Sequence, residues 1–306
     1  MYRDSDDGER SQNAVPDGHE FALCLTHDVD RPYKTYQGAF YALSGDPLYH
    51  LSSLRPSVNP YWQFETIMDL ESRLGVRSAF YVLNEPSLFE SQPPGAWLRP
   101  ENLVEHAGRY DPTASAVADV VRRLDENGWE IGLHGSFHSS TDRARLAEEK
   151  RALESVLGHE VSGGRQHHLK LGDETWEYHR DIGLRYDASI GSSSSVGFAH
   201  GYDLVRPFDD EFVVFPLTAM EVALPDPGDD FESARAVCED LIDEAVANEA
   251  VMTVLWHPRY FNEREFPGYR RLYRWLVERA LDRGAWVGPP GELLDRTARK
   301  SVPDLA

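Results

Sequence analysis

The chain has 306 residues, of which 41% are hydrophobic, so it can bury the core of one large domain or of two small ones. Its 52 acidic and 31 basic residues give a formal net charge of -21. Such a surface argues against nucleic acid and anionic membranes as partners, because both present negative phosphates.

The basic residues are nearly all arginines, and the two cysteines provide no disulfide framework. A lysine-poor, acidic surface resembles that of proteins from salt-loving organisms, where salt screens the repulsion between like charges. The lysines are Lys34, Lys150, Lys170 and Lys300.

Residues 1–18 are polar and acidic, and we expect them to form a flexible tail before a single domain that spans residues 19–300. No segment approaches the roughly 18 apolar residues that a membrane span needs, and the first residues do not resemble a signal peptide. A cytoplasmic location is therefore expected. The sequence leaves the oligomeric state open.

The first predicted strand covers residues 21–25 and leads into the sequence Thr26-His27-Asp28-Val29-Asp30. Asp28 and Asp30 are two residues apart on an extended chain, so their side chains point the same way at the end of a buried strand. Two like charges so close indicate a shared metal ion, or one carboxylate that binds metal beside one that moves a proton. The alternative is an Asp-rich turn that caps a helix.

Residues 31–60 form a long predicted loop. An aromatic loop beside a catalytic strand end can act as a lid or flank and stack on a sugar ring. Packing of the same side chains onto the rim of the domain is the alternative. The aromatic residues in question are Tyr33, Tyr36, Phe40, Tyr41 and Tyr49.

A repeated pattern of an amphipathic helix, a glycine and an apolar strand fills much of the remaining chain. One such helix carries Val117, Val120, Val121 and Leu124 on a single face. Alternating helices and strands predict a parallel sheet covered by helices, either a (β/α) barrel or an open doubly wound sheet. The glycines that would cap the helices are Gly75, Gly128, Gly158, Gly183 and Gly284.

Polar side chains after several separate strands favour the barrel, because a barrel builds its site from the carboxyl ends of its strands. An open sheet would gather its site near one switch point instead. The sequence contains no glycine-rich phosphate loop, which disfavours a nucleotide-driven function.

His134 and His138 stand four residues apart after a predicted strand at 129–133. A helical turn or tight loop would bring both imidazoles onto one side, where with Asp30 they would hold one ion and leave positions open for water and substrate. These ligands suit Zn²⁺ best, and also Fe²⁺, Co²⁺ or Ni²⁺. A structural or solvated histidine pair is the alternative.

His257 ends an apolar run at 251–256, where it would suit a general acid; the alternative is a core histidine that bonds a carbonyl group. Arg165 and Asp187 follow two further predicted strands. They could pair with each other and hold Asp28 ionised and oriented, or form a simple ion pair at the rim.

These motifs, in this order, resemble those of the polysaccharide deacetylases, which are carbohydrate esterases of the chitooligosaccharide-deacetylase homology type. The resemblance spans residues 20 to 290. The segment from Thr26 to Asp30 is similar to the Asp-bearing first motif, and His134 to His138 is similar to the His-x-x-x-His metal motif. The later motifs match at Arg165, at Tyr186-Asp187-Ala188-Ser189 and at Leu255-Trp256-His257-Pro258.

The resemblance implies a distorted (β/α) barrel of about seven parallel strands and the hydrolytic removal of N-acetyl groups from a sugar or glycan. It implies a divalent metal as cofactor. It also implies a role for each residue: Asp28 as base, His257 as acid, Asp30, His134 and His138 as metal ligands, and Arg165 with Asp187 as the residues that position the base and the acid.

Two features depart from the usual motifs. The commonest first motif has adjacent carboxylates, whereas Val29 separates them here, which leaves open which of the two binds metal. Arg165 is followed by Gln166-His167-His168 rather than by Pro-aromatic-Gly. One of these two histidines could contact substrate or the metal, and at most one should do so because neighbouring side chains point to different sides.

Three functions stay open at this point. The first is a metal-dependent carbohydrate N-deacetylase, and the second is an amidase with the same site that acts on a non-sugar amide or ureide. The third is a catalytically silent homologue that binds carbohydrate. The presence of both Asp28 and His257 favours an enzyme, because binding alone needs neither a base nor an acid.

Overall fold

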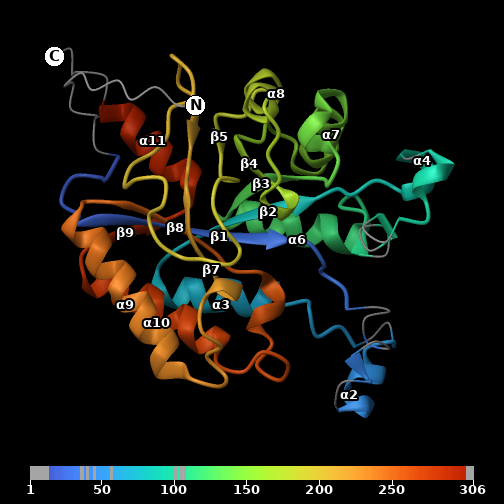
Figure 1. The fold of residues 1–306 in the computed structure, drawn as a ribbon, viewed down its shortest axis with the longest axis horizontal. Helices are drawn as coiled ribbons and strands as arrows, with labels where there is room; N and C mark the ends of the chain where they lie inside the picture. The colour runs from blue at the N-terminus through green and yellow to red at the C-terminus, as the bar shows by residue number, and fades with distance from the viewer. Residues whose placement is uncertain are drawn as a thin grey trace.

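Parallel strands form the centre of the computed structural model, which describes residues 14–34, 38, 41–43, 46–55, 58–91, 93–99, 102–103, 106 and 108–300 (Figure 1). The sheet has nine strands in the order β6-β5-β4-β3-β2-β1-β8-β7, and β9 pairs with β1 as well. Its strands are β1 (Phe21–Val29), β2 (Ala79–Leu83), β3 (Glu130–Gly135), β4 (Gly163–Gln166), β5 (Tyr186–Asp187), β6 (Val213–Val214), β7 (Leu217–Met220), β8 (Val251–Leu255) and β9 (Ala285–Gly288).

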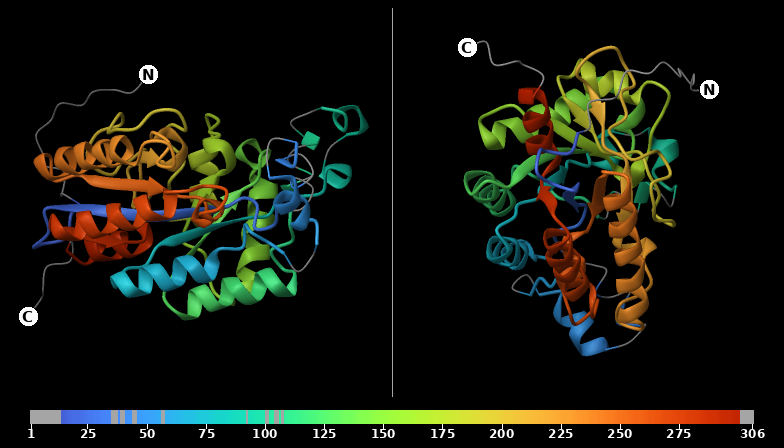
Figure 2. Two further views of the ribbon diagram at one scale, coloured as in Figure 1. Left: turned by 90° about the horizontal axis from the view of Figure 1, so that it is seen from below. Right: turned by 90° about the vertical axis from the view of Figure 1, so that its left-hand side faces the viewer.

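Helices surround the strands, as both views in Figure 2 show. None of the helices in the described part of the chain is long and apolar enough to cross a membrane. The α-helices are α2 (Pro47–Ser52), α3 (Phe64–Leu74), α4 (Leu88–Ser91), α6 (Ser115–Glu126), α7 (Arg143–Leu157), α8 (Thr175–Asp181), α9 (Phe231–Ala247), α10 (Tyr269–Asp282) and α11 (Pro290–Lys300). The short 3-10 helices are η1 (Pro94–Ala96), η2 (Ser139–Thr141), η3 (His167–Leu169), η4 (Glu221–Ala223) and η5 (Pro258–Phe261).

The strand order confirms the expected distorted (β/α) barrel. The two outermost strands of the sheet are β6 and β7, and only residues 215–216 connect them. Because so short a connection keeps the two edges close together, the sheet must curl into a barrel. The two strands beyond the expected seven are these same two. The sequence pattern did not predict these two strands, because it relies on a helix before each strand and residues 188–212, between β5 and β6, contain no helix.

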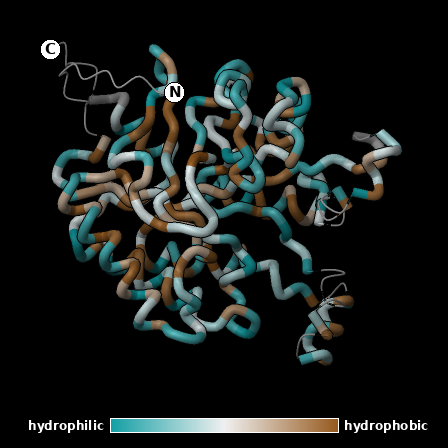
Figure 3. Tube along the Cα trace, in the orientation of Figure 1, coloured by the Kyte–Doolittle hydropathy of each residue, from teal (hydrophilic) through white to brown (hydrophobic). Residues whose placement is uncertain are grey.

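Side chains alternate along β1 between the barrel interior and the surrounding helices. Ala22 and Cys24 belong to one buried cluster, whereas Leu23 and Leu25 belong to the larger cluster that includes the helices. The strands accordingly carry much of the hydrophobic colour in Figure 3. Because Asp28 continues the inward series, the barrel geometry turns it toward the interior at the carboxyl end of the strand.

Glycine makes room for aromatic rings inside the barrel. A Cβ atom at Gly163 would come within 1.9 Å of the Tyr186 ring, a distance that no side chain could occupy. The Tyr81 hydroxyl donates a hydrogen bond of 3.2 Å to the Tyr186 hydroxyl across the interior. Side chains therefore fill this part of the barrel interior, and the pocket that contains Asp28 lies toward the carboxyl ends of the strands.

The N-terminal segment differs from expectation where the structure describes it. Residues 1–13 of the expected flexible tail lie outside the described residues. Ala14 and Val15 are buried, at 3% and 6% exposure, in the cluster that includes Trp286 and Leu293. These two apolar side chains of an otherwise polar stretch therefore pack against the sheet.

Glu130, at the start of β3, predicts a pH-dependent stability. Its carboxylate accepts hydrogen bonds from the Tyr186 hydroxyl at 2.7 Å and from the Gly291 amide at 2.8 Å, and burial raises its pKa from 4.5 to about 7. Between these pH values the unfolded chain has lost a proton that the folded chain keeps, so stability contributed by this group falls as the pH rises.

We therefore expect the stability advantage of the wild type over Glu130→Gln to shrink between pH 4.5 and pH 7 by at most about 3 kcal/mol. Thermal unfolding of both proteins across this range measures it. Other titrating groups are common to the two proteins and cancel in the difference. A difference in Tm that stays constant with pH would contradict the assignment.

Candidate active site

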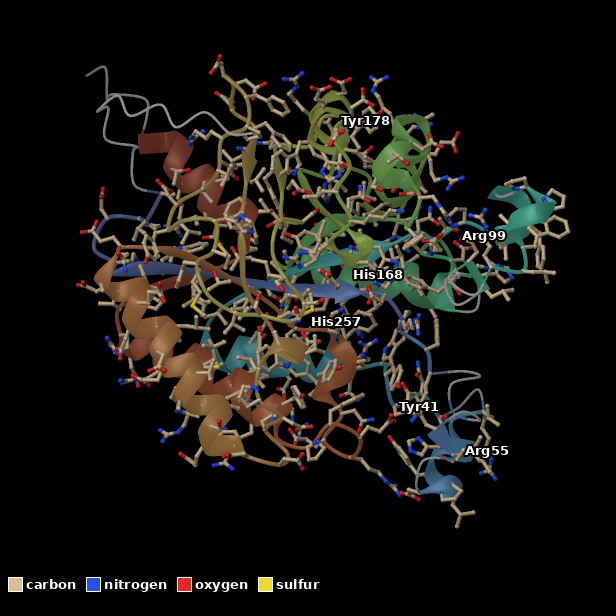
Figure 4. The ribbon with its side chains drawn as sticks, in the orientation of Figure 1. Tyr41, Arg55, Arg99, His168, Tyr178 and His257 are labelled. Carbon is tan, nitrogen blue, oxygen red and sulfur yellow. The ribbon has the colours of Figure 1, made fainter. Side chains whose placement is uncertain are left out.

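The carboxyl ends of the strands surround a pocket of about 290 Å³ that contains most of the candidate residues. In Figure 4, His168 and His257 lie beside the carboxyl end of β1, and both line this pocket. The helices α2 and α4 extend beyond the same end of β1 (Figure 1). Among the residues that line the pocket are Asp28, Asp30, His134, His167, His257 and Arg259.

Asp30 lies among three imidazoles. Its Oδ1 atom is 3.0 Å from His134 Nε2 and 3.7 Å from His167 Nε2, and its Oδ2 atom is 3.2 Å from His257 Nε2. Burial alone would raise the pKa of this carboxyl, but the surrounding imidazoles outweigh burial and hold it well below the usual range. Asp30 is therefore kept ionised.

Asp28 has a different set of partners. Its Oδ1 atom accepts a hydrogen bond of 2.8 Å from Arg165 Nη1, which also donates to Thr26 Oγ1 at 2.9 Å. Arg165 is fully buried, and its Nε atom donates to the Ala188 carbonyl at 2.7 Å. The arginine thus fixes one oxygen of Asp28 and leaves Oδ2 turned toward His134, at 3.8 Å.

His134 provides a test of whether a cation fits here. Its Nδ1 atom is 2.9 Å from the Arg165 carbonyl oxygen, so this nitrogen carries the proton and donates it. Its Nε2 atom would then present a lone pair to the Asp30 oxygen 3.0 Å away. Two acceptors at this distance need either a proton or a cation between them, and the nitrogen and oxygen donors suit a transition-metal ion.

His167 completes this group of donors. One ligand atom from each of Asp30, His134 and His167 lies within 4.8 Å of the others. His168 and Leu169 adopt the left-handed backbone conformation, with φ of 57° and 53°, so the chain turns sharply just after His167. The imidazole of His168 stacks on that of His167 with ring centres 4.1 Å apart.

The structure does not bring His138 into the group. Its Nε2 atom lies 3.0 Å from Asn102 Oδ1. The expected contact assumed a helical turn after His134, but β3 continues through Gly135, and His138 then stands at the start of η2. Four residues of strand and turn carry the side chain away from His134 instead of bringing it back.

Glu221, which the sequence reasoning missed, holds His257. Its Oε1 atom is 2.6 Å from His257 Nδ1, and the glutamate is fully buried. Burial would lower the pKa of His257, but Glu221 and Asp30 together raise it to about 10. Glu221 directly follows β7, one of the two strands that were not predicted, so its place at a strand end carried no recognisable signal.

Asp187 lies apart from the pocket and does not pair with Arg165. Its Oδ2 atom is 3.1 Å from His179 Nδ1, and its Oδ1 atom accepts hydrogen bonds from the Ser189 amide at 2.9 Å and from Trp176 Nε1 at 3.0 Å. Since α8 supplies both His179 and Trp176, this helix binds the carboxylate that was expected to pair with Arg165.

The described aromatic residues of the 31–60 loop pack away from the pocket. Tyr41 and Tyr49 surround the Lys34 ammonium, whose nitrogen lies 5.5 Å and 5.0 Å from their ring centres. Lys34 pairs with Glu265, and Tyr33 packs on Trp62. This geometry supports packing of the loop onto the rim over stacking on a sugar. Tyr36 and Phe40 lie outside the described residues.

On the opposite face of β1 from the pocket, His27 joins a buried polar cluster. Its Nδ1 atom is 2.6 Å from the Trp256 carbonyl oxygen, and its Nε2 atom is 3.0 Å from Glu71 Oε1. Glu71 also accepts hydrogen bonds from Tyr273, Ser78 and Trp129 at 2.6, 2.9 and 2.7 Å. This cluster gives each oxygen of a fully buried carboxylate its partners.

Comparison with known proteins supports the fold without defining the activity. No family model matches the chain, and no curated protein matches it in sequence. Among solved structures, a protein assigned as a polysaccharide deacetylase from Mycobacterium smegmatis is 18% identical, with a TM-score of 0.61 and coverage of 94% of each chain. Another, from Pseudomonas aeruginosa PAO1, is 13% identical, with a TM-score of 0.58 and coverage of 93% of each chain.

PuuE allantoinase is similar to the same degree. It is 14% identical, with a TM-score of 0.60, and the match covers 96% of this chain and 95% of that one. The fold is therefore that of the polysaccharide deacetylases and of this allantoinase.

Proposed function

We propose that this protein is a metal-dependent hydrolase that removes N-acetyl groups from a sugar or glycan. The observation that carries the proposal is that two neighbouring carboxylates have different surroundings. Asp30 is surrounded by imidazoles, whereas Asp28 is fixed by Arg165. One carboxylate is thus arranged to hold a cation and the other to accept a proton.

Asp30, His134 and His167 would hold the ion, and the donor types suit Zn²⁺ as well as Fe²⁺, Co²⁺ or Ni²⁺. When bound, such an ion polarises an amide carbonyl and lowers the pKa of water toward neutrality. The set implied by the motif resemblance has His138 in place of His167. The Asn102 contact of His138 favours His167.

The remaining groups supply the proton transfers. Asp28 takes a proton from the attacking water, and the hydrogen bond from Arg165 orients the accepting carboxylate in the pocket. His257, oriented by Glu221 at 2.6 Å, gives its proton to the nitrogen as the bond between carbonyl carbon and nitrogen breaks. Acetate and the free amine leave, and proton exchange with water restores both groups. Asp187, bound to His179, would support the strand end from outside the pocket.

A ureide or other non-sugar amide is the second candidate substrate. The similarity to PuuE allantoinase favours it, and so does the packing of the described loop aromatics away from the pocket. The same base, acid and ligands would cleave either kind of amide. A silent carbohydrate-binding role is disfavoured, because His257 and Asp28 are both held in place by a dedicated charged partner.

Acetate release tests the proposal. We expect the zinc-loaded protein to release acetate from at least one member of a panel of N-acetylated sugars, and we expect a chelator to abolish the release until metal is restored. Parallel assays with allantoin and simple amides separate the second candidate. Saturable sugar binding without release of acetate by any metal-loaded form would contradict hydrolysis.

A further inference from the structure

Two arginines line the pocket beside the candidate catalytic groups. Arg31 directly follows Asp30, and Arg259 lies in η5, two residues after His257. Both also line a smaller recess between the end of β1 and the start of η5, so they approach the site from the same side. Their presence stands out in a chain whose net charge is -21.

Among the residues that the structure describes, neither arginine is in direct contact with a carboxylate, although Asp30 and Glu221 act on Arg259 electrostatically over a longer distance. Within the described residues, no carboxylate oxygen lies within 4.0 Å of either guanidinium, whereas Arg165 pairs with Asp28 at 2.8 Å. Both side chains are half-buried. Arg259 lies over the Tyr260 ring with its guanidinium carbon 5.2 Å from the ring centre, and Arg31 packs against the backbone of Gly108.

Within the described part of the chain, the two carboxylates that act on Arg259 already have other partners. Glu221 is bound to His257, and Asp30 is shared among three imidazoles. A half-buried guanidinium that lacks an anion loses hydration without gaining a charge-assisted hydrogen bond. Arginine also presents a planar fork of donors that matches carboxylate and phosphate groups. The pocket therefore offers two guanidinium groups that could bind an anionic ligand.

We propose that the substrate carries an anionic group, a carboxylate or a phosphate, which Arg259 and Arg31 bind while the amide lies at Asp28. This inference rests on the proposed function, which it extends from acetylated sugars in general to negatively charged ones. Arg259 and Arg31 are specificity residues, because they contact the substrate away from the bond that breaks.

Three sugars test the inference on the zinc-loaded protein of 306 residues. N-acetylglucosamine is neutral, N-acetylmuramic acid adds a carboxylate, and N-acetylglucosamine 6-phosphate adds a phosphate. We expect kcat/KM to be roughly 10- to 100-fold higher for at least one anionic sugar, as a charge-assisted hydrogen bond predicts. The preferred sugar identifies which anion the site takes.

Matched variants assign the effect to the two arginines. Arg259→Gln and Arg31→Gln should each lose most of the anionic preference, through a KM that rises more for the anionic sugar than for the neutral one. Arg271→Gln removes an equal charge from α10, where the side chain lies over Phe231, and should keep the preference. Equal kcat/KM for neutral and anionic sugars in the wild type, or a preference that both pocket variants keep, would overturn the inference.

Calorimetric binding to the chelator-treated protein separates this inference from the proposed function. Without metal, an anionic sugar cannot bind through an ion. Tighter binding of an anionic sugar that Arg259→Gln abolishes would support the anion site even if no sugar is hydrolysed. Equal binding of all three sugars would contradict it even if acetate is released.

Discussion

The variant Asp28→Asn is expected to lower kcat by roughly 10²- to 10⁴-fold and to retain its metal, because loss of a general base costs about this much. Asparagine preserves the shape of the side chain and can still accept the hydrogen bond that Arg165 donates at 2.8 Å. It cannot take a proton from water at neutral pH. Steady-state kinetics together with metal content of the purified variant measure both parts of the expectation.

Asp30→Asn is the matched control, because it makes the same chemical change two residues away. It should lose metal as well as activity, since Asp30 lies among the three imidazoles. Metal loss in Asp28→Asn with retention in Asp30→Asn would reverse the two roles. Undiminished turnover in Asp28→Asn would rule out Asp28 as the base.

The second large effect concerns the third metal ligand. Loss of a residue that only supports a metal ligand weakens metal binding by roughly 10- to 100-fold. We expect His167→Ala to weaken Zn²⁺ binding by at least this much, because His167 is proposed as a ligand itself. We expect His138→Ala to leave Zn²⁺ binding nearly unchanged. The reason is geometric: His167 Nε2 lies 3.7 Å from Asp30, whereas His138 Nε2 is occupied by Asn102 at 3.0 Å.

Titration of the metal-free proteins with Co²⁺, followed by its visible absorption, measures this without reference to activity. His134→Ala is the positive control, because its Nε2 atom lies 3.0 Å from the same carboxylate. If His138→Ala loses the ion and His167→Ala keeps it, the ligand set implied by the motif resemblance is the correct one.

The sequence predicted those site residues whose positions follow from strand direction. Asp28, Asp30, His134, Arg165 and His257 meet because parallel strands bring their carboxyl ends to one edge, whatever the intervening loops do. The barrel followed from the same regular alternation of helices and strands, and its two unexpected strands lie where that alternation breaks.

Contacts that depend on tertiary choices could not be predicted in this way. His138 required knowing that β3 runs through Gly135 before the chain turns, and Asp187 required knowing that α8 places His179 nearer than Arg165. Glu221 follows a strand of only four residues, too short to show a period. In each case the backbone path, rather than the residue type, decides the partner.

The polar cluster behind β1 fixes the end of the strand that carries Asp28. Asp28 faces the ligand, while its neighbour His27 is tied through Glu71 to α3, to Tyr273 of α10 and to the segments that carry Ser78 and Trp129. The end of β1 is thereby anchored from behind to several separate parts of the chain. We expect Asp28 to keep its position when substrate enters the pocket, because the strand end that carries it is held from behind.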